Sequence, residues 1–179
     1  TLAVAKGIRQ TLDRDSREAA AKVGIKWPND IVVDGKKVCG ILTEMSMEQG
    51  YIHHIVIGVG INVRRQEFSE EIRERAAAID EQCGFCISRS QLIADIMEAF
   101  EEDYEIFLQT HDLKGLRKAY EKLLVNRDRE VCVLDPKGEY RGIARGINDQ
   151  GELIVERQDG TVEEVYAGEV SVRGIYGYV

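Results

Sequence analysis

A polar pentapeptide and a nearby lysine are the residues of this sequence best suited to chemistry. Residues 26–30 read Lys-Trp-Pro-Asn-Asp, and Lys37 follows the Asp34-Gly35 pair a few residues later. We expect this stretch to end a strand, because Pro28 has no N–H to give to a ladder. Loops at strand ends carry function more often than strand interiors do. The simpler interpretation of Asn29-Asp30 is ordinary turn chemistry, and that of Lys37 is a surface lysine beside a turn.

A nearly continuous apolar run at residues 54–63 contains the second feature, two glycines at positions i and i+2. We expect a strand with both faces covered. Alternation places Gly58, Gly60 and Asn62 on one face. The core residues of the other face are Val59, Ile61 and Val63. Bare backbone costs strand stability, and a ligand lying on it is a common compensation; Gly40 extends the strip. The alternative is that the glycines relieve packing against a neighbouring backbone.

The elements around these residues predict an α+β fold. Asp34-Gly35 predicts a tight hairpin turn between two strands. Helical spacing of apolar residues predicts four helices, of which the second and third begin at the capping residues Ser69 and Ser88. The four helices span residues 1–12, 69–82, 91–109 and 113–124. The third would bury a stripe made of Leu92, Ile96, Phe100, Tyr104 and Phe107.

From Arg127 onward the apolar period becomes two, which indicates strands. The predicted strands are residues 130–134, 140–147, 152–156, 162–166 and 171–172, with turns at 135–138, 148–151, 159–160 and 167–168. Five short strands joined by tight turns are typical of a small barrel. We therefore place a domain boundary near residues 125–127, with one domain over 1–125 and another over 127–179.

Composition restricts the partners. The chain has 179 residues and a net charge of −8, so we expect no nucleic-acid contact from this segment. No apolar run reaches the roughly 18 residues that indicate a membrane span. The cysteines are scattered, so we expect them to be reduced and the protein to be cytoplasmic. Cys83 and Cys86 form a single C-x-x-C, without the second ligand pair that a zinc site needs.

Three motifs, in order and spacing, resemble the central motifs of biotin–protein ligases. They are residues 26–30, Gly35-Lys-Lys37 followed by Gly40-Ile-Leu, and Gly58-Val-Gly-Ile-Asn62. Residues 168–174 resemble that family's small C-terminal domain. The family's Gly/Arg-rich loop, which orders over biotin and the adenylate, belongs upstream of these motifs. We therefore expect the chain to lack the N-terminal part of the catalytic domain, and this segment alone to be inactive.

The resemblance implies a fold and an activity. The fold would be a truncated biotin/lipoate ligase-like catalytic domain, with a mixed sheet and packed helices, followed by an SH3-like β-barrel. The activity would be ATP-dependent formation of biotinyl-5′-AMP, using biotin, ATP and Mg²⁺. Biotin would then pass to one lysine of a biotin carboxyl carrier protein, the acetyl-CoA carboxylase subunit. The resemblance leaves a homodimer open.

Site roles also follow from the resemblance. Lys37 would be catalytic, contacting the biotin carboxylate and the α-phosphate. The biotin-binding strip would consist of Lys37, Gly40, Gly58 and Gly60. The ATP or adenylate site would consist of Lys26, Asn29, Asp30, Asn62 and Arg173. Asp30 would either hold Mg²⁺ or act catalytically by orienting the carrier lysine, and the sequence does not separate these roles. A P-loop site is excluded, because no G-x-x-x-x-G-K-[ST] occurs.

Two other functions stay open. A lipoate–protein ligase shares the acyl-adenylate chemistry, but lipoate needs a longer apolar slot than the fused rings of biotin. A non-catalytic, biotin-responsive regulatory or dimerising module is the other, because some members of the resembled family carry an N-terminal winged helix and repress transcription of biotin genes. Such a helix would precede this segment, so the sequence is silent on it.

Overall fold

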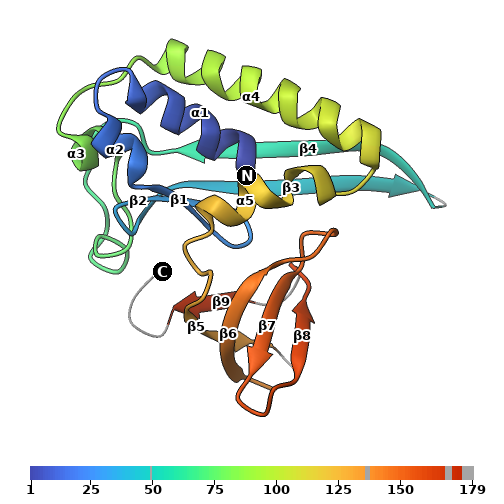
Figure 1. Cartoon of the computed structure of the whole chain (residues 1–179). Coiled ribbons are helices and arrows are strands. Elements are labelled where there is room, and N and C mark those ends of the chain that lie inside the picture. The colour runs from blue at the N-terminus through green and yellow to red at the C-terminus, as the bar shows by residue number, and fades with distance from the viewer. Residues whose placement is uncertain (49, 136–137, 168–170, 175–179) are drawn as a thin grey trace.

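The computed structural model describes residues 1–48, 50–135, 138–167 and 171–174, and these form two sheets and five helices (Figure 1). In the first sheet, β1 (Val23–Lys26), β2 (Asp30–Val33), β3 (Lys36–Glu48) and β4 (Tyr51–Ile61) lie in chain order. Asp34 and Gly35 join β2 to β3 with φ values of 51° and 76°. Both values are positive, as a two-residue type I′ turn requires, so the predicted hairpin is confirmed.

Helices cover one side of this sheet (Figure 1). α1 (Leu2–Asp13) lies between the sheet and α4 (Arg89–Thr110), and it buries Leu2, Ala5, Ile8 and Leu12 as its spacing predicts. Ser88 begins α4 by accepting a hydrogen bond from the Gln91 N–H. Two short helices, α2 (Arg17–Ala21) and α3 (Ile79–Cys83), flank this layer, and α5 (Lys114–Leu123) leads to the second sheet.

The contact between α1 and α4 differs from the predicted aromatic stripe. α4 buries Leu92, Asp95, Ala99 and Asp103, whereas Phe100 is 40% and Tyr104 is 49% exposed. A Cβ at Gly7 of α1 would lie 2.5 Å from Ile96, so the two helices approach closely. The close approach favours small residues at the contact. The two buried acids of α4 are neutralised by basic residues: Asp103 pairs with Lys6 of α1, and Asp95 pairs with Arg14, which follows α1.

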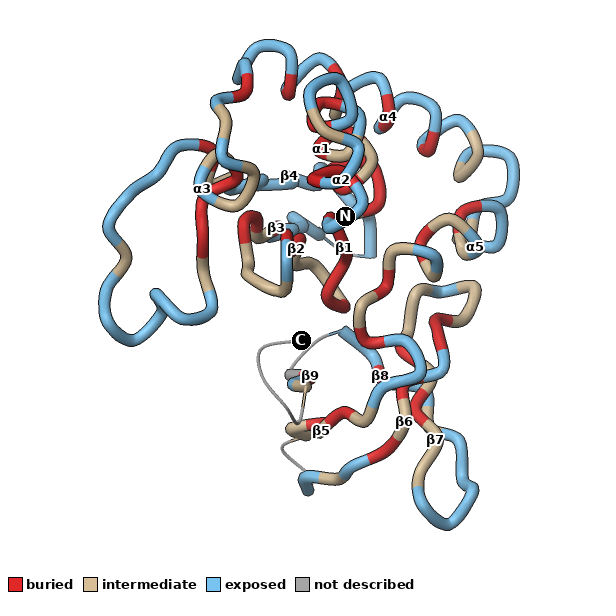
Figure 2. Tube along the Cα trace, turned by 60° about the vertical axis from the view of Figure 1, so that its left-hand side comes forward, coloured by how far each residue is buried: buried red, intermediate tan, exposed pale blue. Residues whose placement is uncertain are grey.

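The prediction that residues 54–63 are covered on both faces is wrong. β4 lies at the edge of the sheet, with β3 as its only neighbour in the part of the chain that the structure describes. Ile57 is 51% and Val59 is 42% exposed, so Val59 is not a core residue, although Val63 is buried. Figure 2 shows β4 in the colour of exposed residues, whereas β1 and most of β2 are buried. Apolar content alone does not reveal whether a neighbour covers a strand.

The helix predicted over residues 69–82 is also wrong. Residues 70–75 form turns, and only α3 at the end of the range is helical. The backbone of this segment pairs with β3 instead, because the Lys37 N–H donates to Arg75 O (2.7 Å) and the Ala77 N–H donates to Lys37 O (2.9 Å). Ile72, which a helix would bury, is 46% exposed. Tertiary pairing has overridden a helical pattern of modest strength.

The second sheet matches its predicted strands closely. β5 (Glu130–Leu134), β6 (Tyr140–Ile147), β7 (Leu153–Arg157), β8 (Val162–Val165) and β9 (Ser171–Gly174) form the order β8-β7-β6-β5-β9. All pairs of strands in both sheets are antiparallel, so the first sheet is not the mixed sheet that the resemblance implied. The α+β class is confirmed. β8 and β9 are the edges of an open sheet among the described residues, and closure into a barrel stays a prediction, as does the boundary near 125–127.

Three of the predicted features contain residues that lie outside the described part of the chain. They are the turns at 135–138 and 167–168, which include residues 136–137 and 168, and the start of the 168–174 motif. Within the described residues, no helix is both long enough and apolar enough to cross a membrane.

Asp95 should contribute to stability in a pH-dependent way. It accepts hydrogen bonds from Thr11 Oγ1 (2.6 Å), Arg14 and Gln91 Nε2 (2.9 Å). The Arg14 guanidinium lowers the pKa of Asp95 to about 2, with help from Thr11 and Gln91 and against the effect of burial. Because the folded-state pKa is depressed, the stabilisation is complete above about pH 4 and is lost as the pH falls toward 2.

We expect Asp95→Asn to lower the free energy of unfolding by roughly 2 kcal/mol at pH 7, and by about half as much at pH 3. Urea unfolding at the two pH values measures this. Asp13→Asn is the matched control, because Asp13 is exposed and its ion pair with Arg17 is long, at 4.0 Å. This variant should lose less than about 0.5 kcal/mol of unfolding free energy. A pH-independent loss in Asp95→Asn would contradict the assignment.

Candidate functional site

The carboxylate of Asp30 lies between two lysines. Lys37 Nζ is 2.5 Å from Asp30 Oδ1, and Lys26 Nζ is 3.9 Å from Asp30 Oδ2. The side chains of Lys26 and Asp30 are 9% and 13% exposed, whereas that of Lys37 is 37% exposed. The partly buried charges therefore compensate one another, and Lys37 is the member that faces open space.

The environment shifts the pKa of Lys26 downward. Burial is the main cause, Asp30 opposes it, and the positive charges of Lys37 and Arg173 add to it. Arg173 belongs to β9 of the second sheet, so the second sheet contributes positive charge to this site. Three other predicted site residues thus act on the charge of Lys26, namely Asp30, Lys37 and, from the second sheet, Arg173.

Gly40, Gly58 and Gly60 form a bare strip across two strands, β3 and β4. Asp30 of β2 pairs with Gly40 of β3, and Gly40 pairs with Gly60 of β4. Gly58 pairs with Leu42 one step further along the same face. A Cβ at Gly58 or Gly60 would meet no atom nearer than 3.7 Å or 3.8 Å respectively. These two glycines therefore relieve no crowding in the described structure, which counts against the packing interpretation.

Gly40 differs from the other two glycines. A Cβ at Gly40 would lie 3.1 Å from both Cε and Nζ of Lys37 and 3.7 Å from Asp30 Oδ1. The bare backbone at residue 40 thus makes room for the Lys37 side chain to fold back over the strip. Lys37, Asp30 and the three glycines line one hollow of about 670 Å³.

A second hollow of about 660 Å³ shares Lys37, Gly40 and Gly60 with the first. Its far wall consists of Asn62, Phe68, Ile72, Arg75 and Ala76. The sequence reasoning missed Ile72 and Arg75, because it assigned residues 69–82 to a helix, and it missed Phe68, which it placed in the connection before that helix. Their signal is the backbone pairing of residues 75–77 with Lys37, and a sequence does not display that pairing.

The two predicted amides are already engaged. Asn29 Nδ2 donates to Ile41 O at 2.6 Å, and the Ile41 N–H donates to Asn29 O at 3.1 Å, so Asn29 fastens the loop to β3. Asn62 Oδ1 accepts a hydrogen bond from Gln66 Nε2 at 3.0 Å, while the Asn62 side chain lines the second hollow. Asn29 thus has the turn role that the sequence also allowed, and Asn62 lies beside the strip.

Metal ligands are sparse in the described part of the chain. No group of three His, Cys, Asp or Glu side chains lies close enough there to hold an ion. Both oxygens of Asp30 face lysine ammonium groups. Mg²⁺ usually binds through one or two carboxylates and substrate phosphates rather than in a protein cage, so Asp30 as a Mg²⁺ ligand stays a prediction.

Comparison with known proteins identifies relatives over most of the chain. The family model of the biotin/lipoate A/B protein ligase family matches residues 1–62. The model of the biotin protein ligase C terminal domain matches residues 128–173. The chain is 34% identical to the bifunctional ligase/repressor BirA of Bacillus spizizenii over 159 residues, covering 87% of this chain and 48% of the relative. It is also 34% identical to the Escherichia coli protein of that name over 156 residues, covering 86% and 47%.

A solved structure shares the fold. The biotin protein ligase from Aquifex aeolicus in complex with biotin and ATP superposes with a TM-score of 0.76 at 25% identity, covering 97% of this chain and 70% of that one. By contrast, the chain spans about half the length of the two curated relatives named above.

Valine at position 60 tests whether the strip is a packing feature. We expect Gly60→Val to keep or raise the melting temperature, because the position has room and valine favours strands. Gly142→Val is the matched control: a Cβ there would lie 2.6 Å from Glu156 O, and overpacking should cost about 2 kcal/mol. Thermal unfolding compares the two variants. Equal losses would mean that the strip glycines serve packing.

Proposed function

Because the chain belongs to the biotin/lipoate A/B protein ligase family, we propose that the protein carrying it forms biotinyl-5′-AMP and transfers biotin to a lysine of a biotin carboxyl carrier protein. The observation that carries the proposal is the position of the Lys37 ammonium. Asp30 holds it over the bare strip at Gly40, at the edge of a hollow that a flat ligand can enter. Two of the similar proteins support it by their names: one is a bifunctional ligase/repressor, and the other is a biotin protein ligase in complex with biotin and ATP.

The first step joins two anions. An oxygen of the biotin carboxylate attacks the α-phosphorus of ATP, the new C–O–P linkage forms, and the bond to the pyrophosphate oxygen breaks. Negative charge develops on the phosphoryl oxygens during this step, and a fixed cation lowers its energy. Lys37 is placed for that role, because its side chain lines both the hollow over the glycine strip and the second hollow.

The substrates divide between the two hollows in this proposal. The fused rings of biotin lie on the backbone of Gly40, Gly58 and Gly60, with the Lys37 side chain beside them at Gly40. The nucleotide extends toward Asn62, Phe68 and Arg75, which offer an amide, an aromatic ring and a guanidinium. The adenylate side is completed by three further residues. Asn29 holds the loop in place against β3, and the positive charges of Lys26 and Arg173 attract the phosphate.

The second step transfers the acyl group. The amine of the carrier lysine, once it has lost a proton, attacks the acyl carbon of the mixed anhydride, an amide forms, and AMP leaves. Asp30 is suited to orient that amine, because it already lies within reach of two lysine ammonium groups. This supports the orienting role of Asp30 over Mg²⁺ coordination. Mg²⁺ remains a prediction, with no described protein cage to hold it.

Biotin is favoured over lipoate by the second half of the chain. The domain model that matches residues 128–173 is specific to biotin protein ligases, whereas the first model covers both substrates. A regulatory role is not carried over from the repressor part of the relatives' names, because the chain matches only about half their length. A homodimer and a cytoplasmic location also stay predictions.

Removing the Lys37 ammonium should stop the first step. We expect Lys37→Ala to lower the rate of biotin-dependent pyrophosphate release by ~10²-fold or more, the size seen when one preorganised stabilising group is removed. Lys36→Ala is the matched control, since Lys36 is the adjacent lysine on β3 but lines neither hollow. Similar rates in the two variants would remove Lys37 from the mechanism.

Covering the strip should block biotin without unfolding the chain. We expect Gly60→Val to weaken biotin binding by at least tenfold, because its side chain would occupy the face where the rings lie. Isothermal titration of the protein with biotin measures this. Unchanged affinity in the folded variant would place biotin elsewhere.

A further inference from the structure

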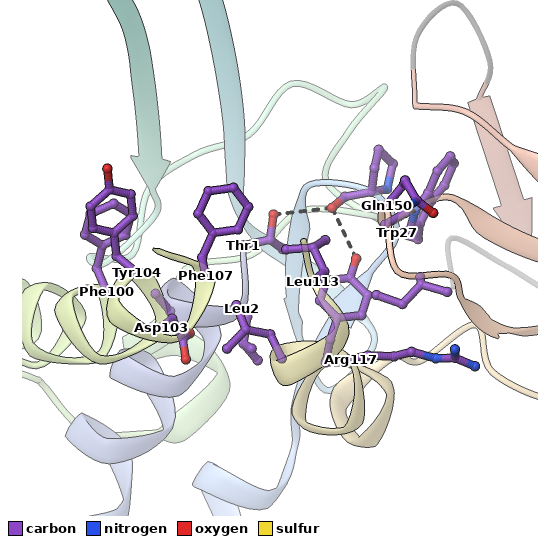
Figure 3. Close-up of a pocket in the computed structure, with 16 residues that line it drawn as sticks. Thr1, Leu2, Trp27, Phe100, Asp103, Tyr104, Phe107, Leu113, Arg117 and Gln150 are labelled. Carbon is purple, nitrogen blue, oxygen red and sulfur yellow. Dashed lines mark hydrogen bonds between the residues drawn. The ribbon is translucent and has the colours of Figure 1, made fainter. Parts of the chain in front are cut away.

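The second sheet meets the site loop at a seam formed around Trp27, which lies immediately before the Pro28-Asn29-Asp30 loop. Trp27 is 1% exposed, and its indole Nε1 donates to Gly151 O in the β6–β7 turn at 2.9 Å. Its backbone N–H donates to Asn126 Oδ1 at 3.0 Å. Figure 3 shows Trp27 beside Gln150 of this turn, next to the Leu113 end of α5. One side chain therefore links the loop that carries Asp30 to the second sheet.

The rest of the seam is closely fitted. The Leu113 N–H donates to Asp149 O at 2.8 Å, and the Ile147 N–H donates to Glu121 Oε1 at 3.3 Å. A Cβ at Gly146 would lie 2.4 Å from Glu121 Oε1, and one at Gly151 would lie 2.8 Å from Leu113 Cδ1. The β6–β7 turn is thus closely packed and hydrogen-bonded against α5 and Trp27, and we call this contact the seat of the second sheet.

The seat of the second sheet determines where Arg173 lies. A hollow of about 600 Å³ runs between the two sheets, and both Lys26–Asp30 and Val172 of β9 line it. Arg173 follows Val172 and contributes to the lowered pKa of Lys26. β9 therefore lies beside Lys26–Asp30, near enough for the charge of Arg173 to act on Lys26. A shift of the second sheet would weaken that effect while leaving the glycine strip of the first sheet unchanged.

We propose that Trp27 is a positioning residue, whose indole N–H holds Gly151 and thereby the second sheet in the place from which Arg173 adds positive charge to the adenylate side of the site. This inference rests on the proposed function. The charge of Arg173 is useful where phosphoryl oxygens gain negative charge, and it has no part in holding the biotin rings. Loss of the indole N–H leaves the part-buried carbonyl of Gly151 without this hydrogen bond and weakens the attachment of the β6–β7 turn to Trp27.

The test is a double-mutant cycle between Trp27→Phe and Arg173→Ala. Each single variant should lower kcat/KM for ATP in adenylate formation by about tenfold, and the double variant should fall no further than either single one. The affinity for biotin should stay within twofold of the wild type in all three. A general structural defect would lower both quantities.

Tyr120→Phe is the matched control. It removes another hydrogen bond to the site loop, from Tyr120 Oη to Pro28 O at 3.3 Å, but this bond comes from α5 and not from the second sheet. Its effect should multiply with that of Arg173→Ala. Glu121→Gln is the second variant if Trp27→Phe does not fold, because it weakens the same seat at Ile147 and should couple to Arg173→Ala in the same way.

The outcomes separate the two levels of the proposal. The full-length protein that carries this chain would refute the proposed function if, without substitutions, it made no biotinyl-5′-AMP. An active wild type, in which the losses from Trp27→Phe and Arg173→Ala multiply to about a hundredfold, would refute the positioning role of Trp27 alone. A fall in biotin affinity parallel to the fall in kcat/KM would also refute it.

Discussion

The partly buried carboxylate of Asp30 is the interaction on which the rest of the site depends. A carboxylate with little access to water needs cations close by, and the chain supplies Lys37 at 2.5 Å and Lys26 at 3.9 Å. The hairpin turn brings Lys37 back to Asp30 across the β2–β3 pair, and Gly40 leaves room for its side chain. The same pairing that satisfies Asp30 fixes an ammonium over bare backbone, which is a suitable arrangement for two anions that must react.

The two faces of the first sheet do different work. One face packs on α1, whose contact with α4 is fixed by buried acids such as Asp95. The other face keeps the glycine strip open, at the cost of side chains that would strengthen the strands. The second sheet is joined to the first through Trp27 rather than through continuous strand pairing. In the proposed site, the first sheet therefore supplies the glycine strip, and the second sheet supplies the positive charge of Arg173.

The sequence predicted local structure well and burial poorly. The Asp34-Gly35 turn, the Ser88 helix start and the strands after residue 130 depend on local backbone preferences, which a short segment displays. Coverage depends on distant elements: the apolar run at 54–63 lies at an exposed edge, and residues 69–82 pair with β3 instead of forming the full helix. Within the site, residue types and order were predictable. Three features were not predictable, because they arise only when the strands adopt their register. They are the two ion pairs of Asp30, the hydrogen bond of the Asn29 amide to β3, and the wall of the second hollow.

A structure of the protein with biotinyl-5′-AMP bound tests the central claim most directly. The account predicts that the ring system lies on the backbone of Gly40, Gly58 and Gly60. It also predicts that a phosphoryl or carboxyl oxygen of the ligand lies about 3 Å from Lys37 Nζ, within hydrogen-bond distance. A ligand bound away from the strip, with Lys37 still directed only at Asp30, would contradict the account.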